Sequence, residues 1–113
     1  GAIITSAGRL KARYVIHAVG PRWGEGDEEA KLRMATLNSL RLAEEHGVRS
    51  IAFPAISTGA FGCPKELSAK AMISAALDYL SRGSSVEEVI FCLYDDETYR
   101  VFEETLRRIA GQR

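Results

Sequence analysis

The sequence predicts an α/β sandwich, and three observations lead to that class. Short runs rich in β-branched and aromatic residues alternate with longer segments that have helical periodicity. The run at residues 50–56 is almost wholly apolar, as expected for a strand that helices cover on both faces. A glycine-containing loop follows this run and leads into a helix. The predicted order is strand, strand, helix, strand, helix, strand, helix.

The first half of the chain is expected to contain two strands and a helix. The strands are residues 2–5 and 14–19. Asp27 is a candidate N-cap, because two acidic residues that suit the helix dipole follow it, and the helix is expected to end at about His46. Its buried stripe is predicted from apolar residues at helical spacing: Met34, Leu37, Leu40 and Ala43.

The strand at residues 50–56 is expected to leave the sheet at Pro54, because proline has no N–H to donate to a neighbouring strand. Residues 57–63 form a loop, and a helix is expected from Pro64 to about Ser81. Its predicted inward side chains are Ala69, Met72, Ile73, Ala76 and Leu80.

The last strand is predicted at residues 86–94. Asp95 or Asp96 is expected to cap a final helix. The predicted buried side chains of this helix are Phe102, Leu106 and Ile109.

Composition indicates a single domain, residues 1–113, of ordinary globular character. Apolar residues make up 46% of the chain and charged residues 27%. Fifteen basic and fifteen acidic residues give a net charge of zero, which argues against a nucleic acid partner held by many phosphate contacts. No run approaches the roughly 18 apolar residues of a membrane span, so a cytoplasmic protein without a membrane partner is expected.

The segment from Ser57 to Pro64 carries the chemistry. It joins a buried strand to a helix, where exposed N–H groups and the helix dipole favour an anion such as phosphate. It is neither a Walker A loop nor a G-x-G-x-x-G motif. The alternative is a plain turn that uses glycine for its backbone angles.

Three segments in register resemble the macro domain family: residues 14–21, YVIHAVGP; residues 50–62, SIAFPAISTGAFG; and the last strand leading into Tyr94. The resemblance implies a three-layer α/β/α sandwich with a mixed sheet that binds ADP-ribose or an ADP-ribosylated substrate. By analogy Phe61 lies beside the distal ribose, and Tyr94 borders the adenine. The implied diphosphate loop comprises Ser57, Thr58, Gly59, Ala60, Phe61 and Gly62.

The resemblance covers only the later part of the family's fold, so this is expected to be an N-terminally incomplete, partial macro domain. The Asn-Ala-Ala-Asn segment and its central strand precede the part matched here. That strand would lie between residues 14–19 and 50–56, so upstream residues, another chain or a rearranged pairing must fill its place. The residues that position the attacking water are expected upstream of Gly1, and no catalytic residue is assigned.

Two functions remain open. One is hydrolysis of ADP-ribose derivatives, either deacetylation of O-acetyl-ADP-ribose or cleavage of an ADP-ribosyl ester on a carboxylate. The other is a binding module without turnover. An unrelated α/β nucleotide or phosphate binder ranks last. No cofactor is expected.

Other polar residues have structural explanations. His17 is expected as a hydrogen-bonded core histidine and His46 as a helix-terminal one, and neither supports a metal site. The helix N-terminus could lower the pKa of Cys63, but no base lies near it in sequence. Asp95 is expected as a helix cap rather than a catalytic group. Trp23, in a glycine-flanked loop, could cover either the core or a ligand.

Overall fold

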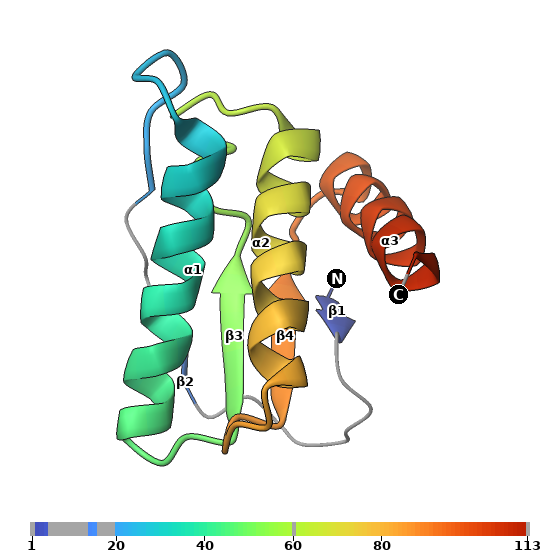
Figure 1. Cartoon of the computed structure of the whole chain (residues 1–113). Coiled ribbons are helices and arrows are strands. Elements are labelled where there is room, and N and C mark those ends of the chain that lie inside the picture. The colour runs from blue at the N-terminus through green and yellow to red at the C-terminus, as the bar shows by residue number, and fades with distance from the viewer. Residues whose placement is uncertain (1, 5–13, 16–19, 60, 113) are drawn as a thin grey trace.

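A computed structural model describes residues 2–4, 14–15, 20–59 and 61–112. Its elements follow the predicted order, and Figure 1 shows the helices packed against a small sheet. The elements are β1 (Ala2–Ile4), β2 (Tyr14–Val15), α1 (Glu28–Glu45), β3 (Ser50–Pro54), α2 (Lys65–Ser81), β4 (Glu88–Cys92) and α3 (Asp96–Gly111). The predicted α/β class is confirmed.

The sheet has the strand order β1-β4-β3-β2. Strand β4 pairs parallel with β3 and antiparallel with β1, so the sheet is mixed, as predicted. Strand β2 pairs parallel with β3, with Tyr14 opposite Ile51. The two runs that would flank the family's central strand therefore pair directly, which is the rearranged pairing among the three arrangements expected.

The strands β3 and β4 are each shorter than predicted. Strand β3 ends at Pro54 instead of Ile56, and Pro54 is its last residue because proline cannot donate to the ladder. Strand β4 begins two residues later and ends two residues earlier than predicted, and its ladder with β3 runs from Glu88 to Cys92. The predicted strand residues 5 and 16–19, including His17, lie outside the described residues.

One face of the sheet carries the core. Side chains alternate between faces along a strand, so Phe53 and Phe91, which are opposite each other in register, share a face. Their ring centroids are 6.2 Å apart, and Phe102 of α3 lies 5.5 Å from Phe91. Helices α1 and α2 lie side by side over this face (Figure 1), and α3 joins the same core through Phe102. The described helices thus pack on one face of the sheet.

Helix α1 buries the predicted Leu40 and Ala43 and packs Leu37 partly buried against the core, but Met34 faces away from it. Met34 was expected in the buried stripe, but its side chain is 53% exposed. Leu32, two residues earlier, is fully buried, and two residues is about 200° around a helix, so both cannot face the core. The spacing of apolar residues does not predict the whole buried face, because two of its residues, Thr36 and Ser39, are polar. The buried residues are Leu32, Thr36, Ser39, Leu40 and Ala43.

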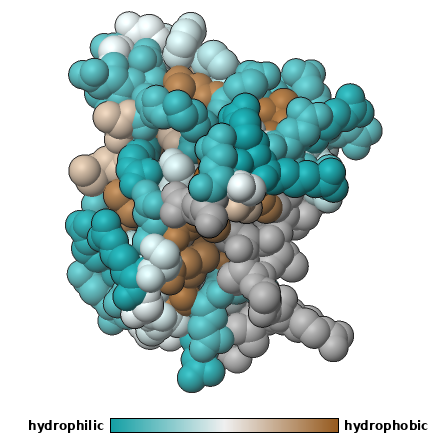
Figure 2. Space-filling model, turned by 45° about the vertical axis from the view of Figure 1, so that its right-hand side comes forward, coloured by the Kyte–Doolittle hydropathy of each residue, from teal (hydrophilic) through white to brown (hydrophobic). Residues whose placement is uncertain are grey.

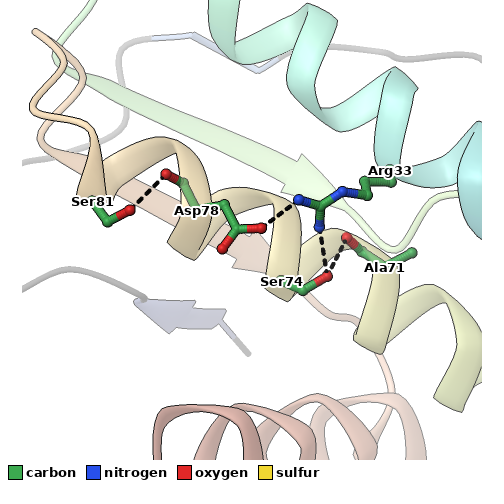
Figure 3. Close-up of polar contacts among 5 residues, drawn as sticks. All are labelled: Arg33, Ala71, Ser74, Asp78 and Ser81. Carbon is green, nitrogen blue, oxygen red and sulfur yellow. Dashed lines mark hydrogen bonds and ion pairs between the residues drawn. The ribbon is translucent and has the colours of Figure 1, made fainter. Parts of the chain in front are cut away.

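Polar contacts join α1 to α2 beside this core. The guanidinium of Arg33 on α1 donates to the Ser74 hydroxyl at 3.0 Å and to the Asp78 carboxylate. Figure 3 shows Arg33 reaching across to both residues of α2. On α2 the predicted core residues Ala69, Met72, Ile73 and Ala76 are buried, while Leu80 packs partly buried against them.

The two helix caps predicted on aspartates differ. Asp27 occupies the N-cap position of α1, but its backbone is left-handed at φ 55° and its side chain makes no capping bond. Asp95 caps α3 as predicted: its carboxylate accepts from the Thr98 N–H at 2.8 Å and from the Thr98 hydroxyl at 2.9 Å. His46, at the C-terminus of α1, bonds to the Leu42 carbonyl oxygen through Nδ1 at 2.9 Å.

The surface is mixed in character. In Figure 2 hydrophilic residues cover most of the visible face, with smaller hydrophobic patches among them, one of which lies next to the residues drawn in grey. None of the helices in the described part of the chain combines the length and the apolar character needed to cross a membrane.

Candidate functional site

A cavity of about 220 Å³ lies where β3 and β4 end. Thr58 and Gly59 form one side, and Tyr94 and Asp95, which follow β4, form the other. The carboxyl ends of parallel strands are where α/β folds place ligands, so this cavity is where the sequence predicted the site. It brings together three predicted residues: Thr58, Gly59 and Tyr94.

Of the remaining predicted residues, Ser57, Phe61 and Gly62 belong to the same strand-to-helix segment but do not line this cavity. Ala60 lies outside the described residues. The cavity also has walls that the sequence did not single out, from Pro54, Ala55, Cys92, Leu93 and Thr98. Their pairing across β3 and β4 depends on register, which no local motif reveals.

The loop is closed at its base and open at its tip. The Cys63 N–H donates to the Ser57 carbonyl at 2.8 Å, and the Gly62 N–H donates to the Gly59 carbonyl at 3.0 Å. The N–H groups of Thr58, Gly59 and Phe61 donate to no other residue that the structure describes. These three N–H groups are the loop's candidate donors to a ligand.

The two described glycines of the loop have different roles. Gly62 has φ 76°, in the left-handed region that favours glycine. Gly59 lies in open space, because a Cβ built on it would meet nothing within 4 Å. Gly59 is thus not required by the packing of the fold, and its missing side chain instead leaves room for a ligand near the backbone.

Ser57 is strained and incompletely bonded. Its φ of 66° is unusual for a residue with a side chain, and its buried hydroxyl oxygen has no hydrogen-bond partner among the described residues. Such strain gathers at functional sites. Next to it, a Cβ on Gly20 would lie 2.4 Å from both Ser57 Oγ and Ile56 Cγ2. Gly20 is therefore required for the close approach of this segment to the end of β3.

The N-terminus of α2 has no capping side chain. Pro64 is the N-cap and makes no side-chain bond, unlike Asp95 at the start of α3. Lys65 adds a positive charge there, although its ammonium is shared with Asp95 at 3.9 Å and Glu97 at 3.2 Å. An uncapped helix N-terminus, beside loop N–H groups that have no acceptor in the described part of the chain, is suited to a small anion.

Asp95 is held beside the cavity by hydrogen bonds from Thr98. The Thr98 backbone N–H and hydroxyl, followed by Lys65, lower the pKa of the Asp95 carboxyl from its ordinary value. Tyr94 beside it is 89% exposed, so its ring is free to contact a ligand.

Cys63 is buried, and burial raises its pKa, an effect to which the charges of Glu28 and Glu25 add. The lowering by a helix N-terminus that the sequence suggested is therefore wrong, because desolvation of the thiolate dominates. Cys92 is half-buried beside the cavity. No group of metal-binding side chains is found among the described residues.

The fold and the loop define a class of protein: α/β domains in which an uncapped helix follows a buried strand and a glycine-containing loop. The sequence profile of the Macro domain matches residues 1–72. A macro domain-containing protein of Caldanaerobacter subterraneus is 48% identical over 110 residues, covering 96% of this chain and 62% of that protein. The chain belongs to the Macro domain family.

Other relatives have more specific names. An O-acetyl-ADP-ribose deacetylase of Citrobacter rodentium is 45% identical over 113 residues, covering 98% of this chain and 64% of that protein. The Oceanobacillus iheyensis macrodomain, solved with ADP, is 30% identical with a TM-score of 0.82, covering 99% of this chain and 60% of that one. The chain thus spans less than two thirds of the length of the proteins it matches.

Proposed function

We propose that the protein carrying this chain binds ADP-ribose and hydrolyses ADP-ribose derivatives, by removing an acetyl group from O-acetyl-ADP-ribose or ADP-ribose from an esterified carboxylate. The observation that carries the proposal is the loop from Ser57 to Cys63, in which the N–H groups of Thr58, Gly59 and Phe61 have no acceptor among the described residues and Thr58 and Gly59 line the cavity. Relatives with deacetylase names and with ADP bound support the choice of ligand.

The loop would act on the diphosphate. The N–H groups of Thr58, Gly59 and Phe61 would donate to its oxygens, and the positive end of the α2 dipole would favour its charge. Tyr94, exposed on the other side of the cavity, would border the adenine, and Phe61 would lie against the distal ribose. Holding both ends of a flexible ligand fixes the position of its reacting bond.

Calorimetry with ADP-ribose and AMP tests the binding. The protein is expected to bind ADP-ribose more tightly than AMP, because only ADP-ribose reaches both the phosphate loop and Phe61. Gly59→Val should abolish ADP-ribose binding without unfolding the protein, since a side chain there meets no protein atom within 4 Å at its Cβ but blocks the ligand. Phe61→Ala should be milder, because it leaves the N–H donors in place.

A matched control is Gly111→Val, which also adds a side chain in open space but at the end of α3. It should leave affinity unchanged. Equal affinities for AMP and ADP-ribose, or normal binding by Gly59→Val, would show that the loop is not the diphosphate site.

Turnover separates the hydrolase from a binding module. Incubation with O-acetyl-ADP-ribose, followed by measurement of released acetate, should show product formation above the uncatalysed rate. Tight ADP-ribose binding with no acetate released, and with no ester cleaved on an ADP-ribosylated carboxylate, would leave the non-catalytic module as the function.

A further inference from the structure

The segment before α1 forms a turn that hydrogen bonds to Glu28 hold in place. Gly24 and Gly26 have φ of 99° and 98°, and the Glu28 carboxylate accepts from their N–H groups at 2.7 and 3.1 Å. The bonds from Gly26 and Gly24 lower the pKa of Glu28. The turn is therefore held by the first residue of α1, although it lies on the surface.

This turn contacts the loop through Phe61. The Trp23 N–H donates to the Phe61 carbonyl oxygen at 2.8 Å. The Arg22 guanidinium carbon lies 5.3 Å from the centroid of the Phe61 ring, over its face. A Cβ on Gly62 would lie 3.8 Å from Trp23 Cβ, which is ordinary van der Waals contact.

Arg22 has no carboxylate partner among the residues that the structure describes. By contrast, Arg33 pairs with Asp78. The charge of Arg22 is thus directed to the aromatic ring, where a cation over the face is attracted by the ring quadrupole. Because Arg22 lies over one face of the Phe61 ring, this contact favours one orientation of the ring.

We propose that Arg22 is a positioning residue: it orients Phe61 for the distal ribose and so contributes to the preference for ADP-ribose over AMP. The inference rests on the function proposed above. Arg22 acts through the ring rather than on the phosphates, and the Trp23 N–H bond fixes the backbone of Phe61 in the same contact. Arg22 and Trp23 lie outside the loop of residues 57–63, so the loop motif in the sequence does not point to them.

The test is a double-mutant cycle on the intact protein, with the dissociation constants of ADP-ribose and AMP measured by calorimetry. Arg22→Met should weaken ADP-ribose binding about two- to five-fold, the equivalent of an exposed cation–π contact, and leave AMP unchanged. Arg22→Lys should retain part of the effect. In a Phe61→Ala background, Arg22→Met should have no further effect, because the ring it orients is gone.

Arg82→Met is the matched control. It removes the same charge at the C-terminus of α2, whereas the loop lies at the N-terminus of that helix. It should change neither affinity. Equal losses from Arg22→Met in both backgrounds would mean that Arg22 contacts the phosphates directly, and no loss in either would remove its role, so both outcomes overturn the proposal. If the unsubstituted protein binds no ADP-ribose, the proposed function fails, and this inference fails with it.

Discussion

Gly20 and Ser57 leave no room between them for another carbon atom. A Cβ on Gly20 would lie 2.4 Å from Ser57 Oγ and from Ile56 Cγ2, well inside contact distance. Gly20→Ala is therefore expected to destabilise the protein by about 1–3 kcal/mol, the usual cost of overpacking. Urea unfolding at constant pH measures this change.

Gly59→Ala is the control for that substitution. Its Cβ would meet nothing within 4 Å, so the free energy of unfolding should change by less than about 1 kcal/mol. Equal effects of the two substitutions would show that the approach of Gly20 to the end of β3 is looser than described.

Single residues were the hardest to predict from sequence. Met34 was placed in the core by its spacing, but the polar residues Thr36 and Ser39 occupy buried positions on α1. The pKa direction of Cys63 was wrong because its burial depends on segments far away in sequence. Arg22 and Phe61 are 39 positions apart, and only the fold brings them together. Asp95, whose capping bond is local, was predicted correctly.

At the level of elements, α3 depends on the charge of its cap. The pKa of Asp95 is below its ordinary value of 3.8, so its ionised form is favoured in the folded state. Its contribution is fully present above about pH 4 and is lost as the pH falls through the lowered pKa. Asp95→Asn keeps a capping oxygen but removes the charge, so its Tm should lie below that of the unsubstituted protein at pH 7.

This difference in Tm should shrink as the pH falls below about 4, because Asp95 becomes protonated as the pH passes through its lowered pKa. Thermal unfolding across that range measures it. Glu104→Gln, on the exposed part of α3, serves as the control, because Glu104 has no hydrogen bond to any described residue. A difference in Tm that stays constant from pH 7 to pH 2 would mean that the charge of Asp95 contributes nothing.

Element types and order could be predicted because the helices have clear periodicity and the strands are apolar. Strand ends could not, since they depend on partners: β4 stops at Cys92 where its pairing with Pro54 ends. The direct pairing of β2 with β3 was one of three arrangements left open, because residues far apart in sequence decide it. The position of the candidate site was predictable, since the loop and Tyr94 follow successive parallel strands.

For the whole molecule, the described residues form a closed core on one face of the sheet and only part of a site. Phe53 and Phe91 are fully buried, whereas Ile90 and Cys92, on the other face, are partly exposed. The cavity of about 220 Å³ is below the roughly 300–1,000 Å³ typical of small-molecule sites. Relatives are longer by more than a third of their own length.

Residues 1–113 expressed alone are therefore expected to bind ADP-ribose far more weakly than the intact protein and to form no stable monomer. Unpaired strand edges and uncovered apolar surface favour association between copies. Thermal unfolding, size-exclusion chromatography and calorimetry test this expectation. A cooperative monomer that binds ADP-ribose tightly would show that the segment contains the whole site.

The bond from the Cys63 N–H to the Ser57 carbonyl closes the loop before any ligand arrives. In kinetic terms, a loop already closed at its base need not fold around its ligand, so little ordering is required during the encounter. Affinity differences among loop variants should then lie in the dissociation rate, with association rates nearly constant. Trp23, the single tryptophan of the chain, adjoins the loop and could report both rates through its fluorescence.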